Sequence, residues 1–112
     1  MTVETSDGVW VTKEGEARFE PDPEVGGSVH VLREDDAVQA GIWAAPPAGG
    51  SDGEAFEFPH HETIYVLTGN VRIQIEDGPL LELGPGDMAS FRKGVRSVWY
   101  PSADFSEFWV YA

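Results

Sequence analysis

The sequence predicts an all-β domain, and three observations carry this prediction. Short runs rich in β-branched and aromatic residues recur along the chain, and clusters of glycine, proline, asparagine and aspartate separate them. No window shows the 3.6-residue apolar period of an amphipathic helix. Many short antiparallel strands with frequent turns are typical of a sandwich or a barrel, because closure of the sheet removes exposed strand edges.

Ten segments have the pattern of strands, and the turn residues between them set their limits. They are Gly8–Thr12, Ser28–Arg33, Val38–Ala45, Glu54–Phe58, Glu62–Thr68, Val71–Glu76, Leu80–Leu83, Met88–Phe91, Ser97–Tyr100 and Phe105–Tyr111. The pair Asp77-Gly78 is typical of a tight hairpin turn. Residues 1–27 are less regular, and we expect them to wrap a barrel of residues 28–112 or to exchange with a partner subunit.

The size and composition indicate a single domain, residues 1–112. The chain has 112 residues, of which 41% are apolar, enough for one packed core. The apolar runs are too short to span a membrane, and the polar, acidic N-terminal segment is unlike a signal peptide. The absence of cysteine excludes disulfides and thiolate metal sites. We therefore expect a soluble, cytoplasmic protein.

The strong negative charge excludes one large class of partners. The net charge is −13, from 20 acidic and 7 basic residues. A polyanion is repelled by phosphate groups, so neither nucleic acid nor an anionic membrane is an expected partner. A solvated acidic surface accounts for this charge, and a salt-adapted host is the alternative explanation.

Two glycine-anchored segments resemble the two motifs of the cupin superfamily. Glu62 lies seven residues before Gly69, and Gly84-Pro-Gly-Asp87 introduces a second strand. Three further features complete the pattern over residues 38–112: Trp43, Gly94 followed by Trp99, and the aromatic strand Phe108–Tyr111. Within the superfamily the chain resembles small single-domain cupins related to ureidoglycine aminohydrolase.

The resemblance implies both a fold and an assembly. It implies an antiparallel double-stranded β-helix, the RmlC-like jelly-roll barrel, with a small-molecule site at the mouth of the barrel. It also implies a homodimer formed through abutting or exchanged sheets. The aromatic final strand, Phe105–Tyr111, offers surface for that contact.

The resemblance also indicates where a metal would be held, and the expected histidines are missing there. Metal-binding cupins carry two histidines before the first-motif glutamate and one in the second motif. The matching positions here carry Phe56 and Phe58, or Ala55 and Glu57, and then Ser97. Of the four expected ligands, Glu62 alone stays in register.

The segment His60-His61-Glu62 offers a rearranged metal site as one alternative. Imidazole and carboxylate together suit a divalent Zn, Mn, Fe or Ni ion. Side chains alternate along a strand, so His60 shares the face of Glu62 unless Pro59 bends the chain and turns His61 inward instead. A further ligand would come from Glu57 or His30. The other alternative is a metal-free pair of histidines at the rim.

Glu62 is the candidate catalytic residue. A carboxylate inside a barrel is paired with a cation such as Arg72 or Arg96, solvated, or neutralised by a raised pKa. Each alternative leaves a polar group facing the cavity. Glu62 is therefore a candidate general acid or base, or a metal ligand.

The candidate ligand-binding residues are mainly aromatic. Aromatic side chains fill the core of a barrel first, and those around Glu62 would form an apolar pocket with a few polar groups. The candidates are Trp43, Phe56, Phe58, Tyr65, Arg96, Ser97 and Trp99. Arg96 would bind a carboxylate of the ligand at the rim, or else it balances surface charge.

The sequence leaves three functions open. The first is an enzyme that acts on a small polar metabolite of amide or ureido type, with Glu62 as acid/base. The second is a non-catalytic small-molecule binding module with a degenerate metal site. The third is a structural or regulatory subunit, for which a filled barrel without a cavity would be the sign.

Overall fold

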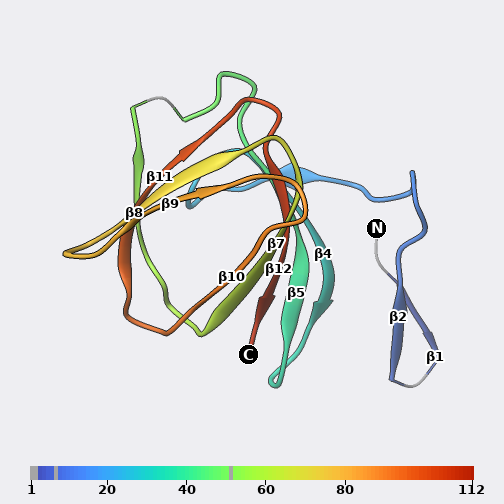
Figure 1. The fold of residues 1–112 in the computed structure, drawn as a ribbon. Helices are drawn as coiled ribbons and strands as arrows, with labels where there is room; N and C mark the ends of the chain where they lie inside the picture. Colours follow the sequence, from blue (N-terminus) through green and yellow to red (C-terminus); the bar gives the residue numbers. More distant parts are fainter. Residues whose placement is uncertain (1–2, 7, 51) are drawn as a thin grey trace.

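The computed structural model describes residues 3–6, 8–50 and 52–112, and these residues form an all-β fold (Figure 1). The strands are β1 Val3–Ser6, β2 Val9–Val11, β3 Glu20–Pro21, β4 Ser28–Glu34, β5 Gln39–Ala44, β6 Glu54–Glu57, β7 Glu62–Thr68, β8 Val71–Ile75, β9 Leu80–Leu83, β10 Met88–Phe91, β11 Arg96–Pro101 and β12 Ser106–Tyr111. No helix long and apolar enough to cross a membrane occurs among the described residues.

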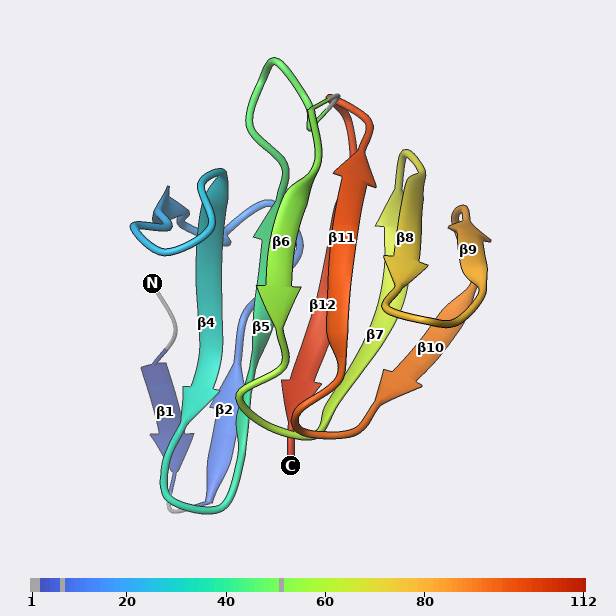
Figure 2. The same ribbon diagram turned by 90° about the vertical axis from the view of Figure 1, so that its left-hand side faces the viewer.

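Two antiparallel sheets enclose the core, which confirms the predicted jelly-roll architecture. The larger sheet has the order β10-β7-β12-β5-β4-β3, and the smaller has the order β6-β11-β8-β9. Figure 2 shows the smaller sheet in front of the larger one. Because β12 pairs with both β5 and β7, the last strand of the chain lies inside the larger sheet.

All ten predicted strands are present, with their ends shifted by a few residues. Phe58, predicted as the end of a strand, lies just after β6, which ends at Glu57. The structure adds β1 and β3 to the prediction. Only two residues of β3 pair with β4, and so short a pairing leaves no period in the sequence.

Two turns follow the residue chemistry that the sequence predicted. Asp77 has a φ of 56° and closes the hairpin between β8 and β9. Gly69 has a φ of 67°, and a Cβ atom built there would lie 2.6 Å from the backbone nitrogen of Phe105. The turn between β7 and β8 therefore needs glycine both for its backbone conformation and for the close approach of another segment.

The core follows the two-residue period of the strands. On β7 and β8 the inward side chains Ile64, Val66, Val71 and Ile73 are almost fully buried, while their neighbours face outward. Phe58 and Phe91 stack at 4.4 Å between ring centroids and join the same cluster. This apolar cluster fills one part of the barrel.

The N-terminal hairpin of β1 and β2 stands beside the larger sheet (Figure 1). The guanidinium of Arg33 lies 4.3 Å from the ring centroid of Trp10, and Thr12 hydrogen-bonds His30 at 2.9 Å. These contacts attach β2 and the next residue, Thr12, to β4.

Candidate functional site

A cavity of about 350 Å³ lies inside the barrel and reaches its surface at the loop between β5 and β6. Its walls come from β4, β5, β6, β7, β11 and β12, with the turn before β4 at the rim. This volume is in the usual range of small-molecule sites. The barrel is therefore not filled, and the cavity supports the two predicted functions that need a ligand.

Glu62 enters the cavity from the first residue of β7. The alternation of β7 places Glu62, Ile64 and Val66 on the inner face, and Glu62 is only 5% exposed. Its Oε1 atom is buried and has no hydrogen-bond partner among the described residues. Burial without a counter-charge raises the pKa of Glu62 to about 8.

Glu107 is a second buried carboxyl group in the same cavity, and the sequence interpretation missed it. It lies on the inner face of β12, is 4% exposed, and also has a buried Oε1 atom without a partner in the described structure. Burial raises its pKa well above the ordinary value, and the charge of Glu62 raises it further. The sequence signal for Glu107 is its place two residues before Trp109 on a mainly apolar strand, because this spacing puts the two side chains on the same inner face.

The strand register fixes how the two glutamates lie relative to one another. Glu62 is opposite Tyr111 across the β7–β12 pair, and Glu107 is opposite Val66. The two glutamates are therefore separated by four residues along the strands, or roughly 13 Å between their backbones. They line one cavity from adjacent strands without standing directly opposite each other.

Tyr111 brings a phenol into this acidic environment. Burial raises its pKa, and the charges of Glu62, Glu107, Asp22 and Glu24 raise it further. The phenol therefore keeps its proton and can act as a hydrogen-bond donor in the cavity. The ring of His60 stacks on Tyr111 with 4.9 Å between centroids.

Three of the predicted aromatic residues line the cavity: Trp43, Phe56 and Trp99. Trp43 Nε1 donates a hydrogen bond to the carbonyl of Gly26 at 3.0 Å. Trp99 Nε1 donates to Ser97 Oγ at 2.9 Å, and Ser97 Oγ donates to the carbonyl of Phe56 at 2.8 Å. The buried Ser97 hydroxyl group thus joins the Trp99 side chain to the Phe56 backbone, and both Trp99 and Phe56 line the cavity.

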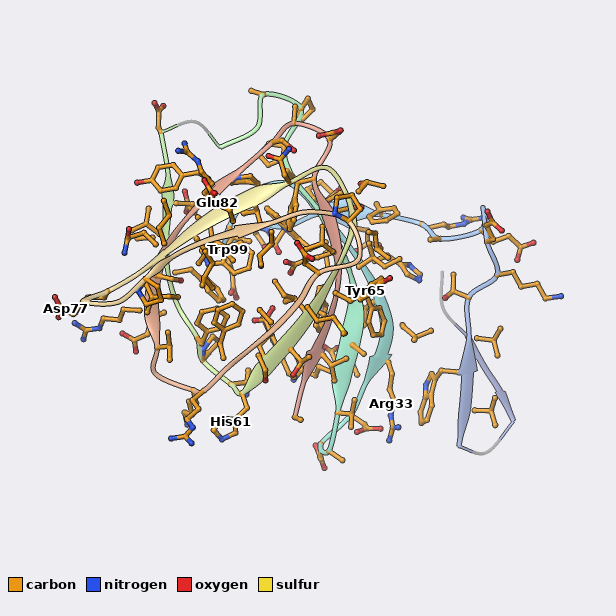
Figure 3. The ribbon with its side chains drawn as sticks, viewed as in Figure 1. Arg33, His61, Tyr65, Asp77, Glu82 and Trp99 are labelled. Carbon is orange, nitrogen blue, oxygen red and sulfur yellow. The ribbon has the colours of Figure 1, made fainter. Side chains whose placement is uncertain are left out.

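Other predicted ligand-binding residues lie elsewhere. Phe58 is 1% exposed and belongs to the apolar cluster. Tyr65 is 43% exposed, because a residue three positions from Glu62 on a strand faces the opposite side of the sheet. Arg96 also points outward, where it pairs with Glu57 at 3.0 Å and lies 4.0 Å from Glu76. Figure 3 shows Trp99 inside the barrel and Tyr65 at the outer side of the larger sheet.

The expected arginine partners of Glu62 are engaged at other places. Arg72 lies over the ring of Tyr100, 5.5 Å from its centroid, and Arg96 is occupied by its glutamate partners. Of the three states foreseen for Glu62, the described structure therefore favours neutralisation by a raised pKa.

The histidines do not gather around Glu62. A bend at Pro59 and His60 interrupts the chain before β7, and both His60 and His61 are exposed. His61 Nδ1 accepts a hydrogen bond from the backbone nitrogen of Lys93 at 3.0 Å, and Figure 3 shows His61 at the outer edge of the barrel. His30 is buried on the far side of the larger sheet, against Thr12 and the carbonyl of Arg18.

The donor set does not fit the divalent metal that the cupin motifs imply. Among the described residues no group of three or more histidine, cysteine, aspartate or glutamate side chains is placed to hold a metal ion. The positions expected to carry metal-binding histidines are instead a wall residue, Phe56, a core residue, Phe58, and the hydrogen-bonded Ser97. The cavity therefore offers proton-transfer groups rather than a converging set of metal ligands.

Solved structures share this fold at low sequence identity. A protein described as ethanolamine utilization protein Q from Salmonella typhimurium LT2 is 18% identical, with a TM-score of 0.74 over 99% of this chain and 91% of that chain. The EutQ protein of Clostridium difficile is 15% identical, with a TM-score of 0.75 over 99% and 92%. An RmlC-like cupin from Shewanella frigidimarina is 17% identical, with a TM-score of 0.71 over 98% and 91%.

The family comparison is more specific than these structural similarities. Comparison with curated proteins found no match. The narrower resemblance to ureidoglycine aminohydrolase domains stays a prediction. The model of the EutQ-like cupin domain matches residues 32–106, which include Glu62 and every strand of the smaller sheet. The chain therefore belongs to the EutQ-like cupin family.

Proposed function

We propose that this cupin binds a small polar metabolite in its barrel and that Glu62 acts there as a general acid or base. The observation that carries the proposal is the buried, unpartnered Oε1 atom of Glu62 in a cavity open to ligands. A carboxyl group with a pKa of about 8 exchanges a proton readily near neutral pH. Tyr111, with its retained proton, is placed to donate a hydrogen bond to the same ligand.

Amide and ureido compounds are the first substrates to test. A protonated carboxyl group donates one hydrogen bond and accepts another, which matches the carbonyl and N–H groups of an amide. Glu62 and Glu107 offer two such groups in one cavity. In such a hydrolysis water adds to the carbonyl carbon and the C–N bond then breaks. Glu62 would donate its proton to the leaving nitrogen, which departs more easily when it is protonated, and would regain a proton from the added water.

The test is a turnover screen of amides and ureas with the parent protein, Glu62→Gln and a control, Glu82→Gln. Glu82, labelled in Figure 3, is an exposed residue on β9 and is not among the residues that line the cavity. We expect ammonia release by the parent and the control and a loss of at least about 100-fold in Glu62→Gln, the usual contribution of general acid–base catalysis. Equal turnover by parent and Glu62→Gln would remove Glu62 from the acid/base role.

A non-catalytic binding module is the second candidate. The linked hydrogen bonds of Trp99, Ser97 and Phe56 favour it, because they hold two cavity walls rigidly where a metal site would be. In that case ligand binding survives in Glu62→Gln, and no amide or urea is turned over by any variant. Binding is followed by quenching of tryptophan fluorescence.

We also propose that the chain forms a homodimer through the outer face of the larger sheet. Met88 and Tyr65 are cross-strand partners there, 70% and 43% exposed, and Phe108 is the next residue in the row. Exposed apolar side chains in one row indicate a contact surface. Met88→Lys with Tyr65→Lys should give a monomer in light scattering, whereas Leu80→Lys, at an exposed apolar position on β9, should stay dimeric.

A further inference from the structure

The charged side chains that line the described cavity are all acidic. Among the described residues that line it, six carry carboxyl groups and none is lysine, arginine or histidine. The six are Asp22, Glu24, Asp52, Glu54, Glu62 and Glu107. Nothing in these walls neutralises an anionic ligand, and every ionised carboxylate attracts a cation.

Two of the six carboxyl groups are buried and aimed into the cavity without a partner. Glu62 and Glu107 are at least nine-tenths buried, and the Oε1 atom of each has no hydrogen bond among the described residues. A buried polar oxygen without a hydrogen-bond partner is destabilising. A ligand with N–H groups supplies a donor to these oxygens, so the two glutamates favour a ligand of that kind.

The aromatic walls suit the same kind of ligand. Trp43, Trp99, Trp109 and Tyr111 line the cavity, and the rings of Trp109 and Tyr111 lie 4.9 Å apart between centroids. The faces of such rings attract a cation, and tryptophan attracts it most strongly. Carboxyl groups and aromatic rings line the same cavity, and both kinds of group can stabilise a positive charge.

We propose that the cavity selects an organic cation with N–H donors, such as an alkylguanidinium or an alkylammonium. This inference rests on the proposed function, since it concerns the ligand of the same cavity. A neutral amide or urea can satisfy the buried oxygens by hydrogen bonds. A cation does so and also balances the charge that a carboxylate acquires when it ionises.

Binding of the cation displaces a proton from the site. The titratable groups that line the cavity with the two glutamates are Tyr111 on β12, Asp22 and Glu24 before β4, Asp52 before β6 and Glu54 on β6. His60 stacks on the ring of Tyr111. Because the pKa of Glu62 is about 8 in the free protein, its carboxyl group is protonated at pH 7 and must ionise to pair with the ligand. The affinity should therefore rise by up to about tenfold per pH unit between about pH 6 and pH 8.

The experiment compares two ligands of nearly the same shape, n-butylguanidinium and n-butylurea, by titration calorimetry. The guanidinium keeps its charge over the whole pH range, so only the protein titrates. We expect n-butylguanidinium to bind at least about tenfold more tightly, or by about 1.4 kcal/mol, at pH 7.5. Calorimetry in buffers of different ionisation enthalpy should show about one proton released for each cation bound.

The variants Glu62→Gln and Glu107→Gln keep the volume of the side chain and remove its charge. We expect at least one of them to lose the preference for the cation and the release of the proton. Glu82→Gln removes the same charge at an exposed site on β9 and should keep both properties. Loss of the preference in Glu82→Gln as well would mean that the overall charge of the protein, and not the cavity, attracts the cation.

The result separates this inference from the proposed function on which it rests. Equal or tighter binding of n-butylurea by the parent overturns the cation inference and leaves the small-molecule site intact. If neither ligand binds at millimolar concentration, both proposals fail. Both of these outcomes come from titrations of the parent protein alone, so they do not depend on the folding of a variant.

Discussion

Glu62→Gln should stabilise this protein, and the gain should grow as the pH rises. Gln is nearly isosteric with Glu and carries no ionisable group. The pKa of Glu62 is raised from 4.5 to about 8 by burial, so the folded protein holds a proton that the unfolded chain loses over this range. A group whose pKa is raised on folding contributes stability at low pH and loses it as the pH approaches the folded pKa.

The expected magnitude follows from the width of this window. Each pH unit between the two pKa values lowers the free energy of unfolding by about 1.4 kcal/mol, which gives roughly 5 kcal/mol over the whole range. Between about pH 5.5 and pH 7.5 the parent should lose roughly 3 kcal/mol through Glu62 alone. Glu62→Gln lacks this loss, so its advantage over the parent should grow by the same amount between the two pH values.

The assay is urea denaturation followed by tryptophan fluorescence, at several pH values, for the parent, Glu62→Gln and Glu82→Gln. Other titrating groups are common to the three proteins, so the difference between two curves isolates the changed residue. Glu82 is exposed, and its variant should run parallel to the parent. Parallel curves for the parent and Glu62→Gln would refute the buried, neutral carboxyl group on which the functional proposals rest.

Three further predictions test the turns, the cavity walls and the histidines. Gly69→Ala should lower the free energy of unfolding by clearly more than Gly86→Ala. Both glycines have a positive φ, for which the conformational strain alone costs about 1–2 kcal/mol, but of the two only Gly69 also lies against backbone atoms of another segment. Equal losses of stability in urea denaturation would contradict this contact. Ser97→Ala should lower the free energy of unfolding by about 1–3 kcal/mol and broaden tryptophan emission, because Trp99 Nε1 and the Phe56 carbonyl lose the hydroxyl group that they share. Ser90→Ala, which removes an exposed hydroxyl group on β10, is the matched control. Replacing both His60 and His61 by alanine should leave the metal content of the purified protein unchanged, because both are exposed and belong to no group of three metal-binding side chains among the described residues. Near-stoichiometric metal in the parent that disappears in this variant would establish a rearranged metal site.

The local features of the molecule follow from the sequence alone. The strands, the Asp77 hairpin and the inward position of Glu62 all depend on residues close together in the chain. The two-residue alternation that places Glu62 inside the barrel also places Tyr65 on the outer face of the sheet, so Tyr65 lies outside the cavity. The family motifs predicted the cupin fold for the same reason, because each motif is a short continuous stretch of the chain that contains a strand and its turn glycines.

The set of side chains that share the cavity depends on how distant strands pair. Glu107 and Tyr111 share a cavity with Glu62 because β12 inserts between β5 and β7, and the paired residues of β7 and β12 are about 40 to 50 positions apart in the chain. The bend at Pro59 and His60 turned both histidines to the surface, and ion pairs on the smaller sheet kept Arg96 there as well. Periodicity states which face of a strand is buried, but it does not state which other strand that face will meet. The acidic, aromatic character of the cavity is therefore a product of long-range strand pairing.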